Sequence, residues 1–188
     1  MRFTVNTRMN GVIYMTKTTL AGLKIAIMVA AGFDEKNFIE IQKMLMSQNA
    51  QLKVISASTG LVQGRIGTQL GMSYPVDSQL SETLAVDYDA LIIPSGEAHL
   101  STLTEELHAA RLIKAFLREN MPVLVQGDAL NLISEIDTAI RTDLVRDQGE
   151  TGRHNRLLWA AAETSIATIT RVFVDVCLEE QDDDSAAA

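Results

Sequence analysis

Short, mainly apolar runs alternate with amphipathic stretches along the first two thirds of the chain. The first of these runs, residues 24–32, ends in small residues and glycine, and runs of this kind are typical of strands buried on both faces of a parallel sheet. The predicted strands are residues 24–32, 51–58, 87–94 and 122–125. Between them, residues 34–49 carry apolar side chains at helical spacing, with Asp34 as a helix N-cap. Residues 95–120 predict a loop and then a helix, with apolar residues from Leu107 to Leu117 along its inner side. This alternation predicts an α/β fold, a three-layer α/β/α sandwich around a mainly parallel, doubly wound sheet.

Other parts of the chain do not follow this alternation of strands and helices. Residues 59–80 carry glycines at positions 60, 64, 67 and 71, which favours a hairpin over a phosphate-binding loop because no helix follows directly. From residue 137 the sequence predicts a turn, a short strand or helix and an exposed polar loop, DQGETGRHN at residues 147–155, and residues 157–178 predict a closing helix. We therefore expect a single domain over residues 21–178, a flexible extension over 1–20 and an acidic disordered tail over 179–188.

Composition and charge narrow the possible functions. The chain has 188 residues with a formal net charge of -8, which argues against nucleic acid as a partner. It lacks an apolar stretch of the roughly 18 to 20 residues that a membrane span needs. The single cysteine excludes an internal disulfide, and three dispersed histidines indicate no metal site. We expect a cytoplasmic protein without a cofactor.

Four ordered motifs over residues 22–135 resemble those of the ThiJ/PfpI superfamily. They are KIAIMVAAGFDEKNF, KVISASTGLVQGRIGTQL, YDALIIPSGEAHL and PVLVQGDALNLI. The resemblance implies the flavodoxin-like fold shared with class I glutamine amidotransferases. Within the superfamily, PVLVQGDA followed by DQGETG at residues 147–152 is most similar to the C-terminal domain of large-subunit, haem-containing catalases.

The resemblance also locates a catalytic elbow that has lost its chemistry. Active members carry a cysteine in a strained turn after the fourth strand, where the helix N-terminus lowers the thiol pKa. That cysteine position falls on Gly127, or on Gln126 if the alignment shifts by one residue. The accompanying histidine falls on Asp128 and the glutamate on Asn37, so all three groups are missing. The lone thiol, Cys177, lies near the end of the predicted last helix.

Three loops are expected to converge on one cleft at the carboxyl ends of the strands. The candidate cleft residues are Asp34, Glu35, Asn37, Ser95, Gly96, Glu97, Gly127 and Asp128. For Asp128, a helix N-cap is favoured over part of an anion pocket. Glu97 and His99 form a weak candidate acid/base pair, and we favour a surface histidine. The cluster of Arg153, His154 and Arg156 could dock a phosphate or carboxylate, although a solvated loop is favoured.

Two functions from different classes follow. The first is a non-catalytic domain that acts in the oxidative-stress response by forming a homodimer or higher oligomer, or by binding a catalase-type or stress-protein partner or a small ligand. Its association would bury apolar helix surface, and methionines such as Met28 and Met72 are expected mostly in the core. The alternative is a hydrolase or lyase, resembling an amidase, protease or glyoxalase, that uses water and the carboxylates of the cleft. A holding chaperone is a third possibility, which requires a large exposed apolar patch.

Overall fold

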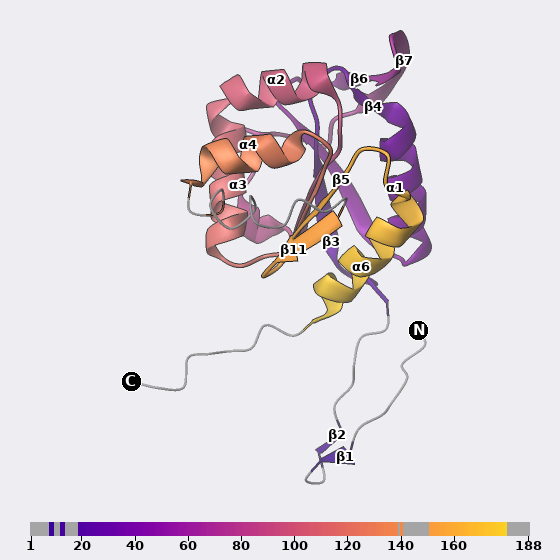
Figure 1. The fold of residues 1–188 in the computed structure, drawn as a ribbon, viewed down its shortest axis with the longest axis vertical. Helices are drawn as coiled ribbons and strands as arrows, with labels where there is room; N and C mark the ends of the chain where they lie inside the picture. The colour runs from indigo at the N-terminus through magenta and orange to yellow at the C-terminus, as the bar shows by residue number, and fades with distance from the viewer. Residues whose placement is uncertain (1–7, 10–11, 14–18, 139, 141–150, 180–188) are drawn as a thin grey trace.

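A seven-stranded sheet forms the centre of the computed structural model, which describes residues 8–9, 12–13, 19–138, 140 and 151–179 (Figure 1). In spatial order its strands are β11 (Thr151–His154), β12 (Leu157–Ala160), β10 (Val123–Gln126), β9 (Ala90–Ile93), β3 (Lys24–Met28), β5 (Gln51–Ser56) and β8 (Ser78–Gln79). Every neighbouring pair is parallel except β11 with β12. The predicted mainly parallel α/β sheet is confirmed.

Helices cover both faces of this sheet (Figure 1). One face carries α1 (Glu35–Ser47) and α6 (Ile166–Leu178), and the other carries α2 (Glu97–Glu105), α3 (Leu107–Arg118) and α4 (Ala129–Ile136). A short 3-10 turn, η1 (Ala85–Asp87), precedes β9. Successive residues of β3 enter opposite layers, with Ile25 and Ile27 on the α1 side and Ala26 and Met28 on the other. The run is apolar because a strand covered on both faces has no solvent side.

The N-terminus of α1 shows the predicted cap. The carboxylate of Asp34 accepts a hydrogen bond from the Asn37 amide at 3.0 Å, and the backbone of Asp34 is extended. Behind this cap, Phe38, Ile41 and Leu45 are buried against the sheet at helical spacing. The cap and the apolar stripe together explain why the helix begins here.

The glycine-rich segment forms the predicted hairpin. Strand β6 (Leu61–Ile66) pairs antiparallel with β7 (Gln69–Pro75), and the short strand β4 (Phe33–Asp34) joins the other side of β6. We call residues 61–75 the arm; it stands beside α1 at the edge of the molecule (Figure 1). A Cβ added to Gly64 would lie 3.0 Å from the Glu35 Cβ, and one added to Gly71 would overlap the Glu35 carboxylate. These two glycines therefore make room for a buried acid.

Three parts of the predicted element order are wrong. The predicted closing helix is divided into strand β12 and helix α6, and the loop expected before the helix at Leu107 contains a helix of its own, α2. Part of the expected polar loop pairs with β12 as the edge strand β11. Residues 157–160 are Leu, Leu, Trp and Ala, and a short run that is apolar on every side has no period that separates a strand from a buried helix. These four residues form a strand because they pair with β10.

The predicted domain boundaries lie near the ends of the described residues. Leu20, which the sequence placed in the extension, is fully buried in the core on the α1 side. Before Thr19, the structure describes only β1 (Arg8–Met9) and β2 (Val12–Ile13), which pair with each other. At the other end, Glu179 is described and the rest of the predicted tail lies outside the described residues.

Candidate functional site

Three loops meet where β3, β9 and β10 end. The amide of Asp34 donates to the carbonyl oxygen of Ser95 at 2.8 Å, which joins the first loop to the second. A Cβ built on Gly127 would lie 3.3 Å from the Ser95 Cβ, so the third loop is in contact as well. The structure thus brings these predicted cleft residues together.

Gly127 has the backbone of a sharp strand-to-helix turn. Its φ is +54°, in the left-handed region, and its amide donates to the Ala160 carbonyl at 2.7 Å. A Cβ would approach the Cβ atoms of Ser95 and Ala162 at 3.3 and 3.2 Å, which is tight on both sides. Glycine therefore adopts this turn without strain, and no side chain projects from it.

Of the polar side chains beside the turn, those of Asp34, Asn37 and Ser95 are hydrogen-bonded within the group, whereas that of Gln126 is not. Asn37 donates from its side-chain amide to the Ser95 hydroxyl at 3.0 Å, and both residues are buried. Asp34 accepts from the Asn37 amide as the cap of α1. Gln126, at the end of β10, is fully buried, and neither of its side-chain amide atoms has a hydrogen-bond partner among the described residues.

Two hollows share Asp34 and Gly96 in their walls. One, of about 480 Å³, is also lined by Gly127, Asp128 and Trp159. The other, of about 500 Å³, lies toward the arm, and its further lining residues include Arg65, Thr68, Glu97 and Ser101. The candidate carboxylates are therefore distributed over two hollows, and only Asp34 borders both.

The expected cap at Asp128 is not formed. Asp128 precedes α4 and is exposed, but its side chain makes no hydrogen bond to the helix. Its φ of -67° and ψ of -5° are helical, whereas a capping residue has an extended backbone that brings its oxygen over the first amides. Its exposed carboxylate instead borders the 480 Å³ hollow.

Glu35 faces away from the cleft and toward the arm. Its side chain is buried and accepts hydrogen bonds from the Met72 amide and the Tyr74 hydroxyl, each at 2.8 Å. Burial, together with this hydrogen bond and the nearby charge of Glu35, raises the pKa of Tyr74 to about 12. Two features of the sequence indicate this contact between Glu35 and the arm: an acid directly after the helix cap, and the glycines at positions 64 and 71.

His99 is buried, and the expectation of a surface histidine is wrong. The Ala30 amide donates to its Nδ1 atom at 3.3 Å, and its Nε2 atom lies 2.7 Å from the Pro94 carbonyl oxygen. Burial lowers the pKa of His99 to about 4, against the opposing effect of the Pro94 hydrogen bond. The neutral ring, with its proton on Nε2, joins the ends of β3 and β9. Glu97, by contrast, is exposed at the start of α2.

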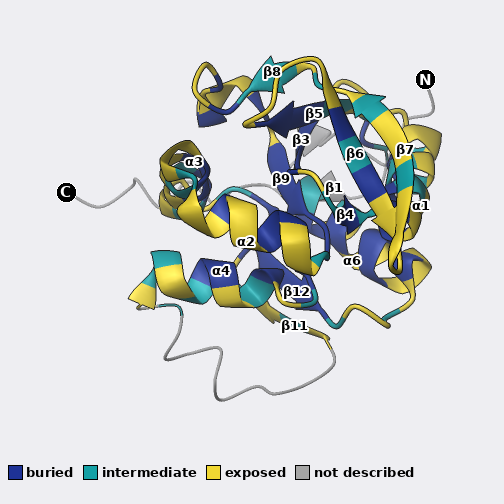
Figure 2. Ribbon diagram, turned by 90° about the horizontal axis from the view of Figure 1, so that it is seen from above, coloured by how far each residue is buried: buried dark blue, intermediate teal, exposed yellow. Residues whose placement is uncertain are grey.

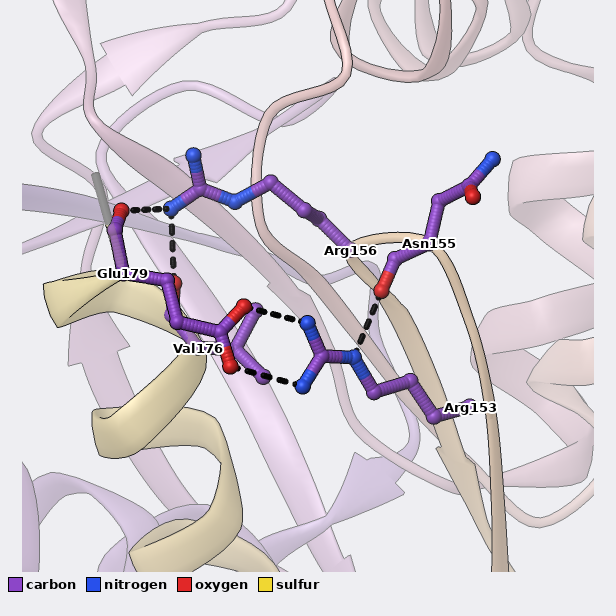
Figure 3. A network of polar contacts seen from close by, with 5 residues as sticks. All are labelled: Arg153, Asn155, Arg156, Val176 and Glu179. Carbon is purple, nitrogen blue, oxygen red and sulfur yellow. Dashed lines mark hydrogen bonds and ion pairs between the residues drawn. The ribbon is translucent and has the colours of Figure 1, made fainter. Parts of the chain in front are cut away.

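The basic cluster of the last hairpin binds the end of α6 (Figure 3). Arg153 forms a two-pronged ion pair with Glu179, which lowers the pKa of that carboxyl, and it also donates to the Asn155 carbonyl. Arg156 is buried and donates to the carbonyl oxygens of Val176 and Glu179 at 2.6 and 3.2 Å. The carboxylate bound by this cluster is therefore one of the protein's own, and the favoured interpretation as a solvated loop is wrong.

Cys177 lies at the opposite end of the sheet from Gly127. Its charged neighbours include Arg156 and Asp89, which directly precede β12 and β9. Burial, the largest cause, raises the pKa of the thiol to about 12. A thiol at this place and in this state is neither near the elbow nor ionised at neutral pH.

The described residues contain no group of three or more histidine, cysteine or acidic side chains placed to hold a metal ion. None of the described helices is long and apolar enough to cross a membrane.

Comparison with known proteins places this geometry in a family. The model of the DJ-1/PfpI family matches residues 23–136. The ThiJ/PfpI domain protein from Brachyspira murdochii has a similar fold, with a TM-score of 0.67 and 21% identity over 81% of this chain and 94% of that chain.

Two relatives of this chain are a catalase and a general stress protein. Catalase HPII from Pseudomonas putida is 29% identical over 130 residues, which are 69% of this chain and 16% of the catalase. General stress protein 18 from Bacillus subtilis is 29% identical over 103 residues, 54% of this chain and 58% of that protein. This chain therefore spans only a small part of the catalase that it matches. Because the family model covers more than half of its length, the chain belongs to the DJ-1/PfpI family.

Proposed function

We propose that this chain is a non-catalytic DJ-1/PfpI domain that acts by association, in the cytoplasm and in the response to oxidative stress. It associates with itself, or with a catalase-type or stress-protein partner, and its cleft holds a small polar ligand. The observation that carries the proposal is Gly127, which adopts the elbow turn at a φ of +54° without a side chain. An elbow of this kind needs a nucleophile to perform acyl or carbonyl chemistry.

The remaining groups support the same conclusion. Asn37 and Ser95 are hydrogen-bonded to each other, and His99 is engaged at both ring nitrogens. Cys177 is distant and has a raised pKa of about 12. The polar side chains that line the two hollows and have no described partner in the cleft are those of Asp128 and Glu97, with Asp34 between them and Arg65, Thr68 and Ser101 on the side of the arm. Such a surface binds and orients a small molecule more readily than it attacks one.

The similarity to catalases supports the stress context. It reaches only 16% of the length of the Pseudomonas putida catalase, so the relationship concerns one domain of that protein. We therefore expect neither haem binding nor peroxide turnover from this chain.

The alternative is a hydrolase or lyase in which cleft carboxylates activate water. It rests on Asp34, which borders both hollows, with Glu97 in one and Asp128 in the other. General acid and base work at neutral pH needs a carboxyl held away from water, but Glu97 and Asp128 are exposed and Glu35 is bound to the arm. We therefore rank this function second.

Turnover assays separate the two functions. Purified protein is tested against methylglyoxal, peptide amides and hydrogen peroxide, beside the variants Asp34→Ala, Asp128→Ala and Cys177→Ala. We expect no turnover above buffer for any of them. Activity that survives Cys177→Ala and is lost in Asp34→Ala or Asp128→Ala would establish the carboxylate enzyme instead.

Light scattering after size-exclusion chromatography tests the association. We expect a dimer or larger species at micromolar concentration. A monomer at every concentration, with no shift on addition of a purified catalase, would contradict the association function.

A further inference from the structure

A large hollow lies at the end of the sheet opposite the cleft. Its volume is about 1140 Å³, and its walls come from α3, the end of α4 and the turn between β11 and β12. Figure 2 shows α3 and α4 on one side of the sheet, both with exposed residues. Met121 and Leu157, near the amino ends of β10 and β12, line the hollow, whereas the cleft lies where β10 ends. We call it the α3 hollow, and none of the candidate cleft residues lines it.

The floor of the α3 hollow is apolar. Among the described residues, six apolar side chains are partly buried against the core on this side of the sheet, and five of them line the hollow. These five are Ala115, Leu117, Met121, Ile136 and Ile140. Leu107, which is 82% exposed at the start of α3, adds a further apolar side chain. The core is therefore incompletely covered at one concave place, as is typical of a site for a small molecule.

Basic side chains line the same hollow in a protein that is acidic as a whole. The chain has a formal net charge of -8. The charged residues of the hollow are nevertheless four bases and one acid, namely Arg111, Lys114, Arg118, Arg156 and Asp137. The first three follow one another along α3 at spacings of three and four residues, which places them on one face of the helix. Such a local excess of positive charge attracts an anion.

The protein itself neutralises these bases only in part. Lys114 is exposed and forms no ion pair with any described residue. Arg111 donates to two backbone carbonyl oxygens before η1, at 3.0 and 2.8 Å, so neutral groups hold it in place. Arg156 also binds carbonyl oxygens, and its buried Nε has no hydrogen-bond partner among the described residues. Arg118 pairs with Glu119, but both side chains are more than half exposed, and such a pair is weak.

We propose that the α3 hollow binds a small amphiphilic anion, a carboxylate with an aliphatic chain. The bases of α3 hold the carboxylate through charge-assisted hydrogen bonds, and the apolar floor covers the chain. A purely polar anion leaves this floor in water, and a neutral apolar molecule gains nothing from the bases. The combination therefore favours a molecule that carries both groups. This site is separate from the cleft and needs no association, so the inference goes beyond the proposed function.

Isothermal titration calorimetry with octanoate tests the class of ligand. Octanoate carries both groups, whereas 1-octanol lacks the charge and acetate lacks the chain. We expect octanoate to bind at least about tenfold more tightly than either of the other two. Absence of octanoate binding, or equal affinities for octanoate and 1-octanol, overturns the inference.

A charge reversal on α3 tests the part played by the bases. Lys114→Glu is compared with Lys43→Glu, since Lys43 is an exposed lysine of α1 on the other face of the sheet. We expect Lys114→Glu to weaken octanoate binding by at least about tenfold, because repulsion replaces attraction at the carboxylate, while Lys43→Glu leaves it unchanged. Circular dichroism verifies that both variants are folded. Equal effects of the two variants, or no effect of either, overturn the inference.

Nuclear magnetic resonance locates the ligand on the full chain. In proton–nitrogen correlation spectra, we expect octanoate to shift the amide signals of residues 107–121 and 154–157 and to leave those of Asp34, Gly96 and Gly127 in place. Shifts confined to the cleft residues overturn the α3 hollow as the site and leave the cleft ligand of the proposed function in place. Shifts around the hollow that disappear in Lys114→Glu support the inference, whatever the oligomeric state of the protein.

Discussion

The cleft and the arm both depend on the first turn of α1, and they use neighbouring residues in opposite ways. Asp34 and Asn37 face the cleft, where they hold the loops together through Ser95. Glu35 faces the arm, where its carboxylate is buried and binds two donors. In the cleft, hydrogen bonds among polar groups hold the three loops around Gly127. At the arm a buried charge holds a ribbon whose outer side is apolar.

This difference shows that the two regions are stabilised in different ways. The turn at Gly127 and the paired loops are stabilised by backbone geometry and by hydrogen bonds among structural residues. The arm, in contrast, is held by a buried acid of α1, by two glycines that make room for that acid, and by the packing of Tyr74 against Phe33 and Phe38. These contacts fix the position of the arm on the domain.

The largest expected effect is the loss of the Glu35 contacts. Glu35→Ala leaves the Tyr74 hydroxyl and the Met72 amide without their acceptor, and we expect the free energy of unfolding to fall by about 3 kcal/mol. Glu40→Ala, at an exposed position of the same helix, is the control and should change it by no more than about 0.5 kcal/mol. Urea denaturation measures both. Equal effects would show that Glu35 contributes no more than a surface acid.

A comparable loss in the free energy of unfolding is expected when acid protonates His99. Its pKa is about 4 in the folded protein, below the ordinary 6.5, so the unfolded chain takes up the proton first. Stability is therefore complete above pH 6.5 and falls between pH 6.5 and about 4, by about 3 kcal/mol in total. The difference between the wild type and His99→Gln across this range isolates the histidine from the carboxyls. Parallel stability curves for the two proteins would rule out a neutral buried ring.

A smaller effect is expected at the elbow. Gly127→Ala meets both a left-handed backbone and the close Cβ atoms of Ser95 and Ala162, whereas Gly67→Ala, at a φ of +59°, has no atom within 4 Å. We expect losses of about 2 kcal/mol for Gly127→Ala and about 1 kcal/mol for Gly67→Ala, measured by thermal or urea unfolding. The difference between these two losses measures the cost of crowding a Cβ atom into the turn at Gly127. If Gly127→Ala were the milder change, a side chain would fit the elbow after all.

The smallest effect is expected at the ion pair that closes the last hairpin on α6. Arg153 and Glu179 are 41% and 45% exposed, so Glu179→Ala should cost less than about 1 kcal/mol and the loss should shrink in high salt. Unfolding in low and high salt measures this. The buried Arg156, which binds helix-terminal carbonyls, serves as the contrast, and Arg156→Ala should cost more at either salt concentration. A larger cost for Glu179→Ala would indicate that the pair acts with Arg156 as one unit.

Much of the architecture was predictable because the buried strands and amphipathic helices have distinct patterns. The apolar runs of β3, β5, β9 and β10, the cap at Asp34 and the hairpin of the arm are all confirmed. The mistaken closing helix arose where an all-apolar run of four residues carries no period. His99 was misplaced because its burial depends on the Ala30 amide and the Pro94 carbonyl, which approach it only in the folded chain.

The sequence by itself determined the α/β class and the convergence of three loops, because these follow from local pattern and connectivity. Only the tertiary structure decided the direction of each polar side chain. Asp34, Glu35 and Asn37 lie within one turn, and long-range packing alone sends Glu35 to the arm and the other two to the cleft. The exposure of a strand edge is decided in the same way. One edge of β7 pairs with β6, and its other, uncharged edge has no strand neighbour among the described residues. Burial is a property of the assembled layers, and no local pattern contains it.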